Sequence, residues 1–161
     1  DQEVGKIYKK NKKVFLKLKK ILPKYICSYP INKYEITKAI LSNKNNLKKI
    51  INIVHFEVRK KMTLFLKKNK YKKFVILDIP LLLENKLNKK NDILIFIDAN
   101  KKEILKKLKK RKNFNLKLFY KFKKIQLPLA HKKQKSDFII KNNFSKKGIK
   151  KDINKILDKI L

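Results

Sequence analysis

Two carboxylates lie in apolar segments at positions where an α/β sheet presents groups to a ligand. Asp78 is in the apolar run 74–79, and Asp98 is near the end of the run 93–99. Ligands of α/β proteins bind beyond the carboxyl ends of the strands, so either aspartate could hold a metal ion or a water molecule there. Each could instead cap a following helix. For Asp78 both interpretations stay open, and for Asp98 we favour the cap.

A third candidate for chemistry is the guanidinium of Arg111. It is one of two arginines among 47 basic residues, and it follows a segment, residues 101–110, whose positive charges are all lysines. A guanidinium fork binds two phosphate oxygens at once, which an ammonium cannot do. The alternative is compensation of a helix dipole, but lysine would serve that purpose equally well. We therefore expect Arg111 to contact phosphate.

The formal net charge of +35 raises a competing hypothesis, a basic nucleic-acid-binding protein. However, the basic residues are almost all lysines, and they are spread along a chain that is also rich in Ile and Asn. The codons of these three residues are rich in A and T, so a biased genome explains the composition. Proteins that read nucleic acids favour arginine. We therefore expect a solvated lysine surface and no nucleic-acid partner.

Length and composition predict one globular domain in the cytoplasm. A chain of 161 residues with 43% hydrophobic residues can bury a core. Cys27 is the only cysteine, which suits a reducing compartment. No apolar run approaches the roughly 18 residues that a membrane span needs, so we expect no membrane partner. The sequence gives no indication of an oligomeric state.

The elements that would position the charged groups follow from the spacing of apolar residues. Up to residue 70 these recur every three or four positions, which predicts helices. After residue 70 compact apolar runs predict buried strands separated by helices, and Asn100 is expected to cap one of them. Such alternation is typical of an α/β fold with a parallel sheet. The expected helices cover residues 2–22, 34–41, 47–66, 101–110, 116–126 and 147–161, and the expected strands cover residues 74–79, 93–99 and 138–141.

The order of motifs resembles the dephospho-coenzyme A kinases, a family of P-loop kinases. Family members carry a V-x-x-x-P-L-L-x-E stretch after a strand, and residues 76–84 are similar to it through Pro80, Leu81 and Glu84. Further similarities, in chain order, are His55-Phe56 for an H-P pair, Asp98 at a strand end, Arg111 after a helix, Gln126, Lys132 in a basic stretch, Ser136-Asp137 and Asn142-Asn143.

The resemblance covers nearly the whole chain and implies both fold and activity. The implied fold is a P-loop NTPase-like three-layer sandwich with a parallel sheet, as a single domain over residues 1–161. Residues 2–70 would bind the acceptor, residues 71–161 would supply core strands and helices, and residues 113–128 would form a helical lid. The implied reaction is ATP-dependent phosphorylation of the ribose 3′-hydroxyl of dephospho-coenzyme A, the last step of coenzyme A biosynthesis. Another P-loop small-molecule kinase is the alternative.

The resemblance also assigns catalytic, nucleotide and metal roles. Asp1 would orient or deprotonate the acceptor hydroxyl, and Arg111 would neutralise charge on the transferred phosphoryl group. Lys132 and Asn142 would join Arg111 in binding ATP. Asp78 could hold Mg²⁺ through a water molecule.

Four residues would lie on the acceptor side, according to the same resemblance: His55, Pro80, Leu81 and Glu84.

The family's phosphate loop is not among the 161 residues, because Gly5 and Gly148 are the only glycines. We therefore expect a first strand and a G-x-x-x-x-G-K-[ST] loop upstream of Asp1, and we expect residues 1–161 alone to be inactive.

Four positions depart from the family pattern and affect its substrate contacts. Gly5 replaces an arginine, Phe56 replaces the proline of the H-P pair, and Lys132 replaces an arginine associated with ATP. Phe144 stands where the family has glycine after the two asparagines. Lys132 keeps the positive charge of the arginine but loses its fork.

Overall fold

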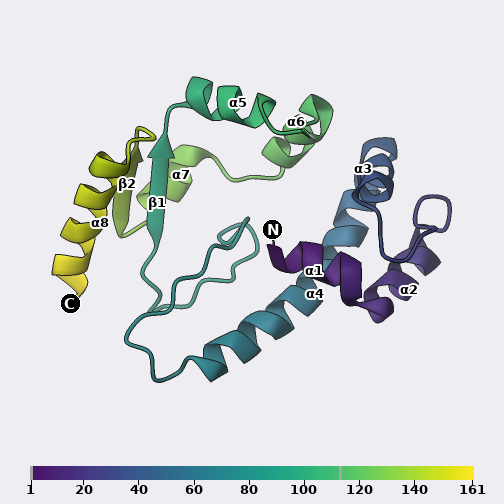
Figure 1. Cartoon of the computed structure of the whole chain (residues 1–161), viewed down its shortest axis with the longest axis horizontal. Coiled ribbons are helices and arrows are strands. Elements are labelled where there is room, and N and C mark those ends of the chain that lie inside the picture. Colours follow the sequence, from purple (N-terminus) through teal and green to yellow (C-terminus); the bar gives the residue numbers. More distant parts are fainter. Residues whose placement is uncertain (1, 113) are drawn as a thin grey trace. The chain divides into compact units, whose positions relative to one another are not determined.

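The computed structural model describes residues 2–112 and 114–161, which form two compact units that divide after Pro80. The first unit is helical and the second combines helices with a small parallel sheet, as Figure 1 shows. We call them the helical unit and the sheet unit. The mixed α/β class predicted from the alternation of apolar patterns is confirmed at this level.

Four helices build the described part of the helical unit. They are α1 (Gln2–Lys10), α2 (Lys12–Ile21), α3 (Lys33–Ser42) and α4 (Lys44–Lys68). The sequence predicted one helix over residues 2–22, and that prediction is wrong at Asn11. The side chain of Asn11 accepts a hydrogen bond from the backbone N–H of Val14 at 3.0 Å and so caps a new helix, α2.

The helical unit has a continuous apolar core. Helices α1, α2 and α3 pack against α4, the longest helix, which is labelled with them in Figure 1. Their buried faces follow the three-and-four spacing of the sequence, because that spacing places side chains on one side of a helix. The buried apolar residues are Ile7, Tyr8, Val14, Phe15, Leu18, Leu22, Ile26, Ile31, Ile36, Ala39, Ile40, Leu47, Ile50 and Val54.

The described residues of the sheet unit form two parallel strands and four helices. In chain order they are β1 (Ile95–Ala99), α5 (Lys101–Lys109), α6 (Leu116–Lys124), α7 (Leu129–Gln134), β2 (Phe138–Asn142) and α8 (Lys146–Ile160). Helix α8 packs against β2, and Figure 1 shows the two strands beside each other with α8 next to β2. Ile95 pairs in register with Phe138, and Ala99 pairs with Asn142. The parallel pairing requires the crossover that the sequence predicted.

The strand predicted over residues 74–79 does not form. This segment forms neither helix nor strand and has no strand partner among the described residues, and Ile76 is 91% exposed. A buried strand needs neighbours that satisfy its backbone N–H and C=O groups. In the described part of the chain, β1 and β2 pair only with each other.

The sheet unit has a much smaller core than the helical unit. Its buried apolar side chains, as far as the chain is described, are Ile140 on β2 and Ile156 on α8. On β1, by contrast, Ile95 and Ile97 are both exposed. The short sheet is thus covered on β2 and left open on β1.

Candidate active site

A partly buried ion pair joins Glu84 to Lys132 in the sheet unit. The Nζ atom of Lys132 lies 2.6 Å from Oε1 of Glu84, and the two side chains are 19% and 10% exposed. The backbone N–H of Leu127 donates to the same oxygen at 2.9 Å. The structure therefore brings together a residue predicted to bind the acceptor and one predicted to bind ATP.

The surroundings of Glu84 keep its carboxyl group ionised. Burial raises the pKa of this group, but hydrogen bonds from Lys132 and from backbone N–H groups, including that of Leu127, outweigh burial and hold the pKa below its usual value of 4.5. The carboxylate is consequently charged at neutral pH and matches the positive charge of Lys132.

Glu84 is held by a turn that starts after Pro80. The backbone N–H of Asn85 donates to the carbonyl of Leu81 at 3.1 Å, and the Asn85 side chain donates to the same carbonyl at 2.8 Å. Leu81 and Lys86, near the two ends of the turn, have positive φ angles of 60° and 50°. Such angles are uncommon in residues other than glycine, because they bring the Cβ atom too close to the backbone. The turn after Pro80 therefore forms as a compact but strained segment.

Asp98 pairs with a lysine instead of capping helix α5. Its Oδ2 atom lies 3.1 Å from Nζ of Lys133, and both side chains are substantially exposed. The helix is capped by Asn100, whose side chain accepts from the N–H of Lys102 at 2.9 Å. The cap predicted at Asn100 is confirmed, and the cap favoured for Asp98 is wrong because Asn100, two residues closer to the helix, occupies the cap position.

Arg111 lies just beyond the end of α5 with an exposed side chain. Its backbone is fixed, since its N–H donates to the carbonyl of Leu108 and its carbonyl accepts from Phe114, both at 3.0 Å. Across the described residues its guanidinium has no ion-pair or hydrogen-bond partner. Within residues 2–112 and 114–161, the five donors of this guanidinium thus remain available to a ligand.

The side chain of Asn142 organises the end of β2. Its Oδ1 atom accepts from the N–H of Phe144 at 2.8 Å, and Asn143 accepts in the same way from Ser145 at 3.0 Å. Phe144 has a φ angle of 62°. The position at which the family has glycine is thus one where the backbone takes the left-handed conformation that glycine adopts freely.

The remaining predicted site residues lie outside the sheet unit. His55 is half-buried on α4, where burial and the nearby Arg59 lower its pKa. The side chain of Asp78 is exposed and caps no helix, which removes the capping interpretation for this residue. Pro80 is the last residue of the helical unit, and Asp1 lies outside the described residues.

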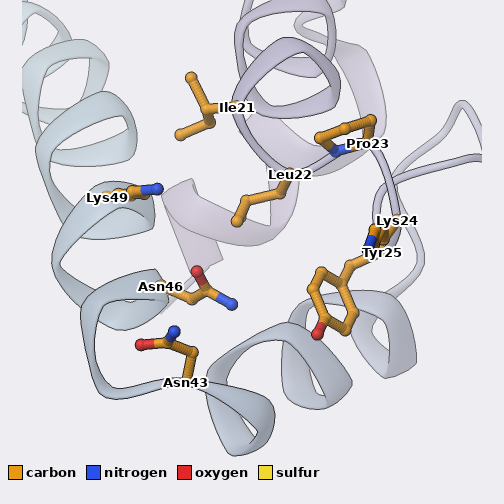
Figure 2. Close-up of a pocket in the computed structure, with 8 residues that line it drawn as sticks. All are labelled: Ile21, Leu22, Pro23, Lys24, Tyr25, Asn43, Asn46 and Lys49. Carbon is orange, nitrogen blue, oxygen red and sulfur yellow. The ribbon is translucent and has the colours of Figure 1, made fainter.

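The helical unit contains a cavity of about 240 Å³ between the end of α2 and the start of α4. Figure 2 shows Leu22 and Tyr25 facing the side chains of Asn43 and Asn46 across it, with Lys49 on the same helix as Asn46. Asn46 is buried and donates to the carbonyl of Ala39 at 2.9 Å. The cavity contains none of the predicted site residues, and its lining has cations and amides but no carboxylate.

The described acidic side chains fit a metal ion only when a bound phosphate ligand supplies the other oxygen ligands. In residues 2–112 and 114–161, no three His, Cys, Asp or Glu side chains lie close enough to hold a metal ion. Mg²⁺ in kinase sites is bound by one or two carboxylates together with phosphate oxygens and water. The exposed carboxylate of Asp78 fits such an ion as a single ligand through water.

Sequence reasoning missed two features near Glu84. It did not predict helix α7, although Pro128 at its start is a common signal for a new helix. It also did not predict that the neighbouring residues Lys132 and Lys133 pair with carboxylates from different segments. In a chain with so few acidic residues, each carboxylate near a strand end was a candidate partner for a lysine.

These features define an α/β protein with charged groups at strand and helix ends, an arrangement suited to phosphorylated ligands. None of the described helices is long and apolar enough to cross a membrane. The family model for dephospho-CoA kinase matches residues 5–147. The chain belongs to the dephospho-CoA kinase family, so the resemblance stated from its motifs is confirmed.

Curated relatives support the same assignment over most of their length. The dephospho-CoA kinase of Wolbachia sp. subsp. Brugia malayi (strain TRS) is 30% identical over 159 residues, which cover 98% of this chain and 81% of that protein. The dephospho-CoA kinase of Wolbachia pipientis wMel is 28% identical, with coverages of 99% and 83%. The one from Rickettsia felis (strain ATCC VR-1525 / URRWXCal2) is 30% identical, with coverages of 86% and 71%.

Proposed function

We propose that the protein is a kinase that transfers the γ-phosphoryl group of ATP to the ribose 3′-hydroxyl of dephospho-coenzyme A. The observation that carries the proposal is the match of residues 5–147 to the dephospho-CoA kinase family. The reaction belongs in the cytoplasm, and the lone, free thiol of Cys27 suits a reducing compartment.

Phosphoryl transfer depends mainly on positioning and on stabilising the charge of the transferred group. Arg111 would bind the phosphoryl oxygens, since its guanidinium is exposed and has no partner among the described residues. Lys132 would add an ammonium near the nucleotide, and Asn142 would shape the loop that follows β2. Mg²⁺, when bound with ATP, would neutralise phosphate charge, and Asp78 is the residue that would contact it through water.

The acceptor would contact His55, Pro80 and Leu81, as the family resemblance implies. His55 would be neutral at pH 7, because burial and Arg59 lower its pKa. A neutral imidazole can donate or accept one hydrogen bond from a ribose or phosphate group. Asp1 would orient or deprotonate the attacking hydroxyl, a role proposed from the family resemblance alone.

An activity assay tests the proposal directly. No G-x-x-x-x-G-K-[ST] motif lies within the 161 residues, so the assay uses the full product of the gene that encodes them. ATP with dephospho-coenzyme A should give coenzyme A and ADP, and other alcohols offered as acceptors should react poorly. Absence of phosphate transfer to dephospho-coenzyme A, with transfer to another small molecule, would favour a kinase of different specificity.

Arg111→Lys tests the phosphate contact within the same assay. Loss of the bidentate contact should lower kcat/KM by more than about threefold, which corresponds to roughly 0.7 kcal/mol of transition-state stabilisation. Arg59→Lys, which changes the other arginine of the chain, serves as the matched control. Equal values for wild type and Arg111→Lys would remove Arg111 from the mechanism.

A further inference from the structure

One oxygen atom of Glu84 holds two groups from a segment more than forty residues away. Oε1 accepts from the backbone N–H of Leu127 at 2.9 Å and lies 2.6 Å from the ammonium of Lys132. Charge-assisted hydrogen bonds of this length are about twice as strong as neutral ones. Because Glu84 is only 10% exposed, water competes weakly for either partner.

Both partners of Glu84 belong to the segment that follows helix α6. All nine residues of α6 are described and none is fully buried, so little packing holds the helix in place. At its start, Asn115 caps the helix and Phe114 contacts Phe119 with 6.2 Å between ring centroids. At its far end, the N–H of Leu127 is fixed by Glu84. Glu84 thus fixes the segment that follows α6, which is the segment that would bend when α6 moves.

The adjacent lysine, Lys133, offers an internal comparison. Its ion pair with Asp98 is 3.1 Å long, and the two side chains are 47% and 40% exposed. Solvent screens exposed pairs, and most of them contribute little. The Glu84 pair is better shielded, with side chains 19% and 10% exposed, so removal of one partner leaves a charge that water compensates less well. Loss of the Glu84 pair should therefore disturb this segment far more than loss of the Lys133 pair.

We propose that Glu84 is a positioning residue that fixes the hinge of the α6 lid at Leu127 and orients the ammonium of Lys132 toward the nucleotide. This inference rests on the proposed kinase function and deepens it. The ammonium has three donors, so the contact with Glu84 leaves two for phosphate oxygens. Glu84 acts through Lys132 and Leu127 and makes no contact with the acceptor.

Hydrogen exchange tests the hinge without requiring activity. In Glu84→Gln, the peptide covering residues 125–134 should exchange about tenfold faster, because a charged acceptor is lost at the N–H of Leu127. Lys133→Met is the matched control and should leave this peptide within about twofold of wild type. Unchanged exchange in Glu84→Gln, or equal acceleration in both variants, overturns the hinge. Peptides from β2 report whether the sheet unit of each variant remains folded.

Kinetics of the full gene product tests the role in the reaction. Glu84→Gln should lower kcat by about tenfold and change the KM for dephospho-coenzyme A by less than about twofold, since only the lid and Lys132 are affected. Lys132→Arg, which keeps the ion pair, should retain most of the kcat that Lys132→Met loses. An increased KM for the acceptor at unchanged kcat would place Glu84 against the acceptor and overturn the inference. A wild-type protein that transfers no phosphate would contradict the proposed function, and the exchange experiment would still decide whether Glu84 fixes the hinge.

Discussion

The backbone at Phe144 makes a sharp prediction about local stability. Its φ angle of 62° lies in the left-handed region, where a side chain costs about 1–2 kcal/mol relative to glycine. The phenyl ring also contributes, because Nζ of Lys107 lies 4.5 Å from its centroid. A direct replacement by glycine would change both the ring and the backbone. We therefore compare Phe144→Gly with Phe144→Ala, which lose the same ring and differ only in Cβ.

The expected difference follows from two opposing contributions. Glycine avoids the left-handed cost of about 1–2 kcal/mol, and it loses about 0.5–1 kcal/mol through its greater freedom in the unfolded chain. The glycine variant should thus be more stable than the alanine variant by about 0.8 kcal/mol. In the glycine variant, the equilibrium constant for local opening of the β2–α8 connection should thus be about fourfold smaller.

Native-state hydrogen exchange followed by mass spectrometry measures this difference locally. Peptides that span residues 138–150 should exchange about fourfold more slowly in Phe144→Gly than in Phe144→Ala. Peptides from α4 provide the reference and should exchange equally in both variants. Equal or faster exchange in the glycine variant would refute the assignment of a left-handed backbone at this position.

Further predictions concern the helical unit and the cap of α5. Burial raises the pKa of Tyr8 to about 12. The neutral phenol should therefore make its full contribution to the free energy of unfolding below pH 10. That free energy should fall by about 3 kcal/mol as the pH rises through 12. Denaturant unfolding followed by circular dichroism measures this loss, which Tyr8→Phe should abolish and the exposed-site control Tyr71→Phe should retain. Burial first, and Arg59 second, lower the pKa of His55, so an NMR titration should give a midpoint below 6.5. The stability from the neutral ring should be present above pH 6.5 and lost as the pH falls through that midpoint, and Arg59→Gln should raise the midpoint only in part. Asn100→Ala should destabilise the first turn of α5 by about 1 kcal/mol, whereas Asn100→Asp should preserve protection from exchange there.

Local patterns in the sequence were sufficient for most of the helices and for two strands. The spacing of apolar residues predicted α4 and its inner face, and the structure buries Leu47, Ile50 and Val54, whereas Phe65, predicted on the same face, is 49% exposed. Asn100 was recognised as a cap because it separates an apolar run from a helical pattern, and it caps α5. These features depend on interactions within a few residues, which are visible in a single sequence.

Features that depend on distant partners were not predicted. The segment 74–79 has the composition of a buried strand, but strand formation requires a neighbour that local composition does not specify. The pairing of Glu84 with Lys132 joins residues 48 positions apart, and the family resemblance marked Lys132 for ATP but gave no sign that it pairs with Glu84. The strain at Phe144 had a signal, because glycine in the family at this position indicates a positive φ angle.

The open side of β1 has a consequence for how copies of the protein behave in concentrated solution. Ile95 and Ile97 are exposed on a strand that has one unpaired edge in the described sheet, and such edges favour pairing between molecules. The net charge of +35 opposes this, because every approaching copy is strongly repelled. The repulsion extends over about 30 Å at 0.01 M salt and over only about 3 Å at 1 M salt. The lysines that make the sequence resemble a nucleic-acid-binding protein thus keep the exposed strand edges of different copies apart. Ionic strength sets the distance over which this repulsion acts.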